Sequence, residues 1–214
     1  MTARYPRYMS STAEEASRYW REETLRDGTT IVIRAIRPDD RERLLRHFSS
    51  MSEEARYFRF FGLKRALTDT DLDHFTCLDF VNHVGLVAVT SEDGQERFIG
   101  VGRYIVHEGS SNRAEVAFAV LDDYQGRGIG TLLLEHLAVM ARRQGILEFT
   151  AEVMGANAKM LEVFENSGFA VRESREPGAV HVAFPIEAAS AFLAAHAHRE
   201  SDGRSPFRSG PSDI

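Results

Sequence analysis

The sequence predicts an α/β (α+β) domain in which strands and helices share one core. Three observations lead to this fold class. Short apolar or alternating segments, such as Val84–Thr90 and Ala114–Leu121, are typical of strands. Segments with apolar residues at helical spacing, above all the one that starts near Arg127, are typical of amphipathic helices. The third observation is a glycine-rich run that joins Ala114–Leu121 to that helix.

The chain divides by composition into an arm, a main domain and a tail. Residues 1–28 read as an arm that is partly helical, with a helix over Glu14–Leu25 and Asp27-Gly28 as its stop. Residues 29–185 form the main domain, residues 186–198 a C-terminal helix, and the Ser/Gly/Pro/Arg-rich residues 199–214 a disordered tail. The first half of the domain is expected to contain a strand Thr29–Arg37, a helix Arg41–Ser50 capped by Pro38-Asp39-Asp40, and two short helices opened by Ser52 and Thr68. A hairpin of strands Val84–Thr90 and Phe98–Val106 follows, and then a strand Ala114–Leu121 and a helix from Arg127 to near Gly145. The domain is expected to end with a strand Ile146–Met154, a helix Asn157–Ser167, and strands Phe169–Glu173 and Val180–Phe184.

Composition excludes several classes of protein. The 214 residues are 43% hydrophobic and 27% charged, which is an ordinary balance for a soluble globular domain. No apolar run approaches the roughly 20 residues of a membrane span, and the N-terminus lacks a signal peptide's apolar core, so we expect no membrane partner. The single cysteine, Cys77, excludes an internal disulfide or a multi-cysteine zinc site. We therefore expect a cytoplasmic protein without a metal. The net charge of −6 argues against nucleic acid as a partner.

The glycine-rich run is the segment most indicative of chemistry. Gly126, Gly128 and Gly130 alternate where the chain turns from strand to helix. Glycine permits positive φ, and a helix N-terminus offers unpaired N–H groups and a partial positive charge. Together they predict a cradle for a phosphate or pyrophosphate. A Walker A loop would need Lys-Ser/Thr after Gly130, and a dinucleotide fingerprint would need a glycine at Thr131, so neither fits.

The pattern that fits is Q/R-x-x-G-x-G/A, present as Gln125-Gly126-Arg127-Gly128-Ile129-Gly130. It resembles the acetyl-CoA pyrophosphate loop of the GNAT (GCN5-related) N-acyltransferases. The segment Asn157–Phe169 is similar to a second motif of that family, N-x-x-[A/M]-x-x-[L/V]-[Y/F]-x-x-x-G-F. The order of predicted elements is also the family's order. The resemblance implies a GNAT fold over residues 29–185, with a central mixed, mostly antiparallel sheet of about six to seven strands flanked by helices.

A narrower resemblance lies in the N-terminal half. The segments Ile33–Asp40 and Phe48–Phe61 are similar to the Pat-type protein lysine acetyltransferases, in which a GNAT domain is joined to a regulatory or ligase-like domain. Here 28 residues precede the first expected strand, too few for a cyclic-nucleotide-binding domain.

The resemblance implies roles for individual residues. Glu115, on the strand beside the thioester, is the candidate general base; the alternative is an exposed glutamate on a half-solvated strand. Backbone groups of Phe118, Ala119 and Val120 would pair with the pantetheine amides. Asn157 would contact the CoA arm or cap its helix. Phe164 stands where many family members place a tyrosine that protonates the thiolate. The pyrophosphate would be held by the loop residues Gln125, Gly126, Arg127, Gly128, Ile129, Gly130 and Thr131, with Arg127 either adding charge or solvated.

The implied reaction is attack of a neutral amine on acetyl-CoA. A lysine amine has a pKa of about 10.4, so a base or a desolvating site must help. The leading acceptor is a protein lysine, such as that of acetyl-CoA synthetase. The alternatives are a small-molecule amine, or a non-catalytic acyl-CoA-binding sensor, which Phe164 motivates. The resemblance is compatible with a monomer or a homodimer. We expect His83, His107 and His181 to be structural or exposed, and Cys77 to be a buried thiol.

Overall fold

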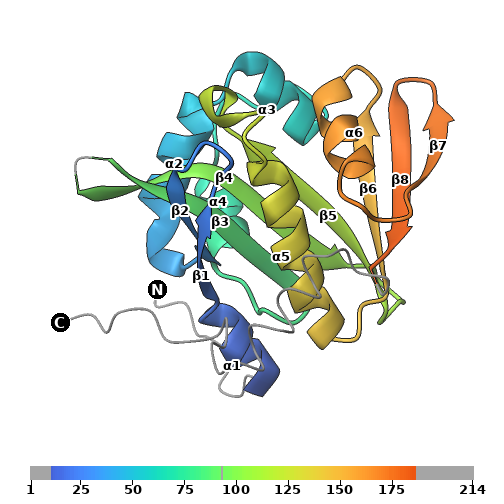
Figure 1. Ribbon diagram of the computed structural model, residues 1–214, viewed down its shortest axis with the longest axis horizontal. Helices are drawn as coiled ribbons and strands as arrows, with labels where there is room; N and C mark the ends of the chain where they lie inside the picture. The colour runs from blue at the N-terminus through green and yellow to red at the C-terminus, as the bar shows by residue number, and fades with distance from the viewer. Residues whose placement is uncertain (1–10, 93, 187–214) are drawn as a thin grey trace.

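The computed structural model describes residues 11–92 and 94–186, whose strands form one eight-stranded sheet in the order β1-β2-β3-β4-β5-β6-β8-β7 (Figure 1). Neighbouring strands are antiparallel except β5 and β6, which are parallel. The predicted fold class, a mixed and mostly antiparallel sheet flanked by helices, is confirmed. The strands are β1 (Trp20–Thr24), β2 (Thr30–Ala35), β3 (His83–Glu92), β4 (Gln95–Val106), β5 (Arg113–Val120), β6 (Glu148–Met154), β7 (Arg172–Glu176) and β8 (Ala179–Pro185). The helices are α1 (Ser11–Ser17), α2 (Arg41–Ser50), α3 (Glu53–Phe60), α4 (Asp69–Thr76), α5 (Ile129–Arg143) and α6 (Ala158–Glu165), with 3₁₀ turns η1 (Pro38–Asp40) and η2 (Asp122–Tyr124).

The helices cover opposite faces of the sheet. On β4, a Cβ at Gly102 would lie 3.1 Å from Leu137 of α5, whereas the next residue, Arg103, lies against Phe75 of α4. Successive strand residues point to opposite faces, so α5 and α4 lie on different sides of the sheet. The small residues Gly100 and Gly102 let α5 approach β4 closely. This arrangement buries ten of the fifteen residues of α5 and fixes where its N-terminus lies.

The N-terminal arm differs from its prediction. The expected helix Glu14–Leu25 ends at Ser17, and Trp20–Thr24 is instead an edge strand paired with β2. Asp27-Gly28 is therefore a hairpin turn and not a helix stop: Gly28 has a φ of +84°, and the Leu25 amide donates to the Thr29 carbonyl at 2.8 Å. An Asp-Gly pair between two alternating segments is a strong hairpin signal. This strand raises the count in the described residues to eight.

Three smaller predictions also need comment. The expected strand Phe169–Glu173 begins at Arg172, because Phe169 turns inward and stacks on Phe184. Cys77 lies just beyond α4 and is exposed, so the prediction of a buried thiol is wrong. The predicted C-terminal helix, apart from Ile186, and the predicted tail lie outside the described residues. None of the helices that the structure describes combines the length and apolar character needed to cross a bilayer.

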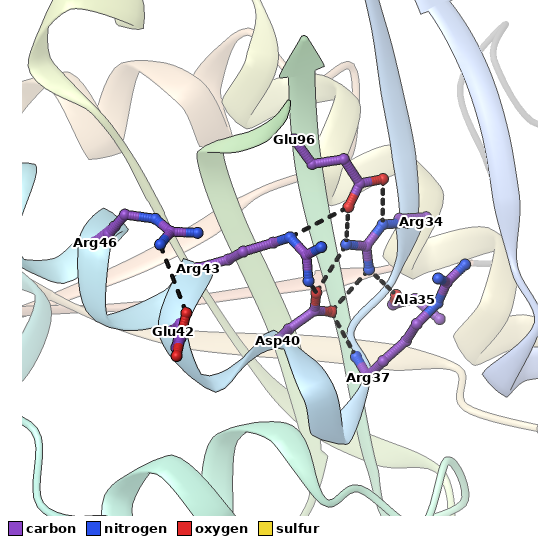
Figure 2. A network of polar contacts seen from close by, with 8 residues as sticks. All are labelled: Arg34, Ala35, Arg37, Asp40, Glu42, Arg43, Arg46 and Glu96. Carbon is purple, nitrogen blue, oxygen red and sulfur yellow. Dashed lines mark hydrogen bonds and ion pairs between the residues drawn. The ribbon is translucent and has the colours of Figure 1, made fainter. Parts of the chain in front are cut away.

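A buried ionic network ties β2 to α2 and β4 (Figure 2). Arg34 is only 1% exposed, and its two terminal nitrogens donate to the two carboxylate oxygens of Asp40 at 2.8 and 2.9 Å. Arg34 also donates to Glu96 at 2.6 Å. Asp40 was expected to cap α2, but its side chain makes no cap bond there and instead accepts from Arg34 and from the Arg37 amide. The Asp40 carboxylate therefore neutralises the buried Arg34 guanidinium and does not cap the helix.

One half-buried carboxyl on α5 gives the fold a pH dependence. Burial and the nearby charge of Glu23 raise the pKa of Glu135 to about 7 from its ordinary value near 4.5. The folded state therefore favours the protonated carboxyl, and its contribution to stability is fully present below about pH 4.5 and lost as the pH rises through 7. We predict that Glu135→Gln raises the melting temperature at pH 8 and leaves it nearly unchanged at pH 4. Thermal melts of Glu135→Gln beside the exposed Glu165→Gln would test this, and an equal shift at both pH values would contradict it.

Candidate active site

The strand β5 loses one of its two partners halfway along its length. It pairs with β4 from Ala114 to Val120, but with β6 only at Arg113, Ala114 and Glu115. Beyond this point β6 pairs with β8 alone, and no strand of the described residues pairs with the edge of residues 116–119 that faces β6 (Figure 1). Unpaired peptide groups on a strand edge can bind an extended ligand that carries amides. The divergence of β5 and β6 supplies such an edge.

This unpaired edge leads into the predicted anion cradle. The chain passes from β5 through η2 to Gly128, the N-cap of α5, which has no side chain to cap the helix. Within the described residues, none of the backbone N–H groups from Gly126 to Thr131 donates a hydrogen bond to a protein acceptor. Their donors and the positive end of a 15-residue helix make this an anion site.

The three glycines have two different physical roles. Gly126 and Gly128 have φ values of +74° and +87°, and an added Cβ on either would meet nothing within 4 Å, so backbone conformation is what requires glycine there. Gly130 has ordinary helical geometry. A Cβ on it would lie 3.3 Å from Val163 of α6 and 3.4 Å from Phe118 of β5, so packing requires glycine at this position. It lets α5 begin directly against α6 and β5.

The polar side chains of the loop hold its shape. Gln125 donates to the Val120 carbonyl at 3.1 Å and accepts from Lys159 of α6 at 2.9 Å. The Arg127 guanidinium stacks 5.0 Å from the Tyr124 ring centroid and donates to the Asp123 carbonyl at 3.0 Å. Arg127 therefore folds back on its own loop, and Lys159 is a cation at this site that the sequence reading did not single out.

Phe118, Phe164 and Asn157 lie where α6 meets β5. Phe164 is 1% exposed, and its ring centroid lies 5.6 Å from Phe118 and 5.7 Å from Phe184. It joins an apolar cluster that anchors α6. The Asn157 side chain accepts from the Met160 amide at 3.2 Å, which is the capping role left open above. Ala119 and Val120 are half-buried at the end of β5.

Glu115 is the last residue of β5 that still pairs with β6. It lies on the face of the sheet opposite to the one that carries Phe118. Its side chain is exposed, and its cross-strand neighbours are Ile105 and Thr150. The Thr150 hydroxyl is hydrogen-bonded to His107 at 2.7 Å. His107 was expected to be structural or exposed; the fold brings it into the neighbourhood of Glu115 through Thr150. This face of the sheet is the one that α3 and α4 approach.

Two arginines on this face were missed by the sequence reading. Arg103 follows Gly102 on β4, opposite Ala117, and is 6% exposed. Burial and the charge of Arg59 on α3 hold the pKa of Arg103 well below its ordinary value. Burial also lowers the pKa of Arg59, an effect that the nearby carboxylate of Glu115 offsets in part. An arginine inside an apolar strand was the signal that could have found this pair.

Comparison with known proteins agrees with this geometry. The acetyltransferase (GNAT) family model matches residues 47–169. An acetyltransferase of Pseudomonas aeruginosa is 34% identical over 149 residues, which cover 69% of this chain and 78% of the relative. The crystal structure of the GNAT domain of S. lividans PAT has a TM-score of 0.71 and 38% identity, with 85% of this chain and 99% of that chain covered. A Salmonella typhimurium acetyltransferase solved with its cofactor acetyl-CoA shares the fold, with a TM-score of 0.59, 20% identity and 75% and 96% of the two chains covered.

The match to the acetyltransferase Pat of Mycolicibacterium smegmatis covers only part of that protein. Identity is 33% over 144 residues, which are 67% of this chain but 42% of the relative. The family is nevertheless established by the extent of the matches above. The free amides of the glycine loop and the unpaired edge of β5 are groups that acetyl-CoA can use. The chain therefore belongs to the acetyltransferase (GNAT) family, as a Pat-type N-acetyltransferase whose co-substrate is acetyl-CoA.

Proposed function

We propose that this enzyme transfers the acetyl group of acetyl-CoA to a protein lysine and that Glu115 is the general base. The observation that carries this proposal is the position of Glu115. Its carboxylate stands at the residue where β5 loses its pairing with β6, and the free strand edge from there leads to the unpaired amides of the glycine loop. A base at one end of the donor site and an anion cradle at the other fit an extended acyl donor.

Specific groups would hold the donor. The backbone of Phe118, Ala119 and Val120 would pair with the pantetheine amides, and the N–H groups from Gly126 to Thr131 would bind the pyrophosphate. Gln125 and Asn157 keep the neighbouring backbone in place through the bonds described above. Arg127 and Lys159 supply positive charge at the rim of the loop.

The chemistry requires one proton to leave the acceptor amine. Glu115 accepts that proton, and the neutral nitrogen forms a bond to the thioester carbonyl carbon as the carbon–sulfur bond breaks. Phe164 is buried among aromatic rings and has no proton to give. The departing thiolate therefore takes its proton from water or from the attacking nitrogen, which loses its second proton as the amide forms.

The likeness to Pat-type enzymes supports a protein lysine as acceptor, with acetyl-CoA synthetase as the first candidate. The test is to incubate the purified chain with acetyl-CoA and that protein and to locate acetyl-lysine by mass spectrometry. Acetyl-CoA-dependent modification of a single lysine is the expected result. Turnover of small amines such as polyamines with no protein acetylation would contradict the acceptor assignment and leave the acetyltransfer reaction intact.

We predict that Glu115→Gln lowers kcat/KM for the amine by about 10²- to 10⁴-fold, the usual contribution of a general base. Acetyl-CoA binding should persist, because the amide does not touch the glycine loop. The exposed Glu152→Gln on β6 is the matched control and should keep wild-type turnover. A Glu115→Gln enzyme with unreduced kcat/KM would show that another group is the base.

A further inference from the structure

Arg103 is a buried cation that the fold leaves without a counter-ion. It is 6% exposed, its Nε has no hydrogen-bond partner, and one terminal nitrogen lies 3.5 Å from the His83 Nε2 atom. In the part of the chain that the structure describes, no carboxylate forms an ion pair with Arg103 or Arg59. Removing a guanidinium from water without a compensating charge is strongly unfavourable.

Arg34 provides the comparison within the same sheet. It is also buried, at 1% exposed, yet Asp40 and Glu96 accept short hydrogen bonds from it (Figure 2). Where this fold needs a buried arginine for structure alone, it also supplies the carboxylates. The Arg103 guanidinium instead lies 4.0 Å from the centroid of the Phe75 ring, which holds it in place, and apart from the long contact of one terminal nitrogen with His83 no protein group of the described residues accepts from it.

The two histidines beside Arg103 contribute no charge at neutral pH. Burial and the charge of Arg103 lower the pKa of His83 to about 3, and the same two causes lower that of His74. Both imidazoles are therefore neutral near pH 7. Two further carboxylates act on the histidines, but Asp71 pairs with Lys64 at 2.9 Å and Asp79 accepts from the backbone N–H groups of residues 81–83. Neither of them forms an ion pair with Arg103 in the described part of the chain, so Arg103 and Arg59 keep their charge beside the proposed base, Glu115.

We propose that Arg59 and Arg103 form a subsite for a carboxylate carried by the acceptor, beside the amine that Glu115 deprotonates; this rests on the acetyltransfer proposed above. Arg103 lies opposite Ala117, two residues along β5 from Glu115, so the two positions are about 7 Å apart along the strands. That separation fits an amine and a carboxylate on one acceptor. The carboxylate is either an acidic side chain next to the target lysine or the α-carboxylate of a free amino acid.

The experiment compares acceptors that differ only in one negative charge. One pair is a lysine peptide with aspartate or asparagine beside the lysine; the other is free lysine and lysinamide. For at least one pair we expect the wild-type kcat/KM to favour the charged member by about ten- to a hundred-fold, the range of charge-assisted hydrogen bonds. In Arg103→Gln and Arg59→Gln this ratio should fall toward one. The exposed Arg175→Gln on β7 is the control and should keep the wild-type ratio.

The outcomes separate this inference from the proposed function. Preference within the peptide pair identifies an acidic neighbour of a protein lysine, and preference only for free lysine identifies an amino-acid acceptor. Efficient transfer with a wild-type ratio of one for both pairs would overturn the carboxylate subsite and leave acetyltransfer standing. So would a ratio that survives in both arginine variants while they still bind acetyl-CoA. Absence of transfer to every amine would instead contradict the proposed function.

Discussion

Gly128→Glu should abolish detectable binding of acetyl-CoA while the protein remains folded. Gly128 is the N-cap of α5, has a φ of +87°, and lies in the middle of the segment Gly126–Thr131 whose amides are unpaired. A glutamate there would put a carboxylate where the pyrophosphate binds, and it would compete for the same N–H groups. We expect the dissociation constant to rise by about 100-fold or more, equivalent to about 2.7 kcal/mol. Isothermal titration with acetyl-CoA measures this directly.

The control for this substitution must carry the same backbone strain. Gly145 has a φ of +83°, and an added Cβ there would also meet nothing within 4 Å, but it lies beyond the opposite end of α5. Gly145→Glu should therefore cost similar folding stability and retain binding. Equal loss of affinity in both variants would mean that strain, and not the anion cradle, accounts for the effect. Unchanged affinity in Gly128→Glu would place the pyrophosphate elsewhere.

Asp40→Asn should destabilise the fold more than any surface substitution. Burial alone would lower the pKa of Arg34, but the bonds from Asp40 and Glu96 raise it above its ordinary value, so the guanidinium is charged in the folded protein. Removing the carboxylate charge leaves that cation only partly compensated inside the fold. Breaking a buried ion pair in this way costs about 3–5 kcal/mol. Urea unfolding of wild type and variant, followed by circular dichroism, measures the change in the free energy of unfolding.

An exposed ion pair supplies the comparison. Arg18 and Glu14 form an i,i+4 pair at 2.7 Å with side chains that are 65% and 55% exposed. Arg18→Gln should change the free energy of unfolding by less than about 1 kcal/mol. If Asp40→Asn proved as mild as Arg18→Gln, the network in Figure 2 would not stabilise the link between β2 and α2.

Local signals in the sequence were sufficient for most of the fold. The glycine loop, α5 and the central strands follow from residue patterns that depend on a few neighbours, and they lie where the patterns put them. The arm was misread because Ala16, Tyr19, Trp20 and Leu25 give a partial apolar stripe at helical spacing, although Trp20–Thr24 is a strand. Its conformation is decided by pairing with β2, a contact that no local pattern reports.

The site was predictable in its backbone and less so in its side chains. Gly126 and Gly128 have positive φ, and glycine is the residue type that adopts such a conformation readily, so the sequence itself indicates it. Arg59 and Arg103 are 44 positions apart (103 minus 59), and only the packing of α3 against β5 and of α4 beside β4 brings them together. Arg127 was expected either to add charge at the pyrophosphate or to be solvated, and its contacts are with Tyr124, the Asp123 carbonyl and Asp27. The direction of each side chain depends on contacts with residues that are distant in the sequence, and local patterns do not report those contacts.

The most direct test of the proposed donor site is amide hydrogen exchange with and without acetyl-CoA. The predicted result is slower exchange at residues 116–131, where the unpaired edge of β5 and the amides of the glycine loop would gain acceptors, with little change at the fully paired β3. Protection confined to another region, or no protection at saturating acetyl-CoA, would contradict the assignment of the donor to the divergence of β5 and β6.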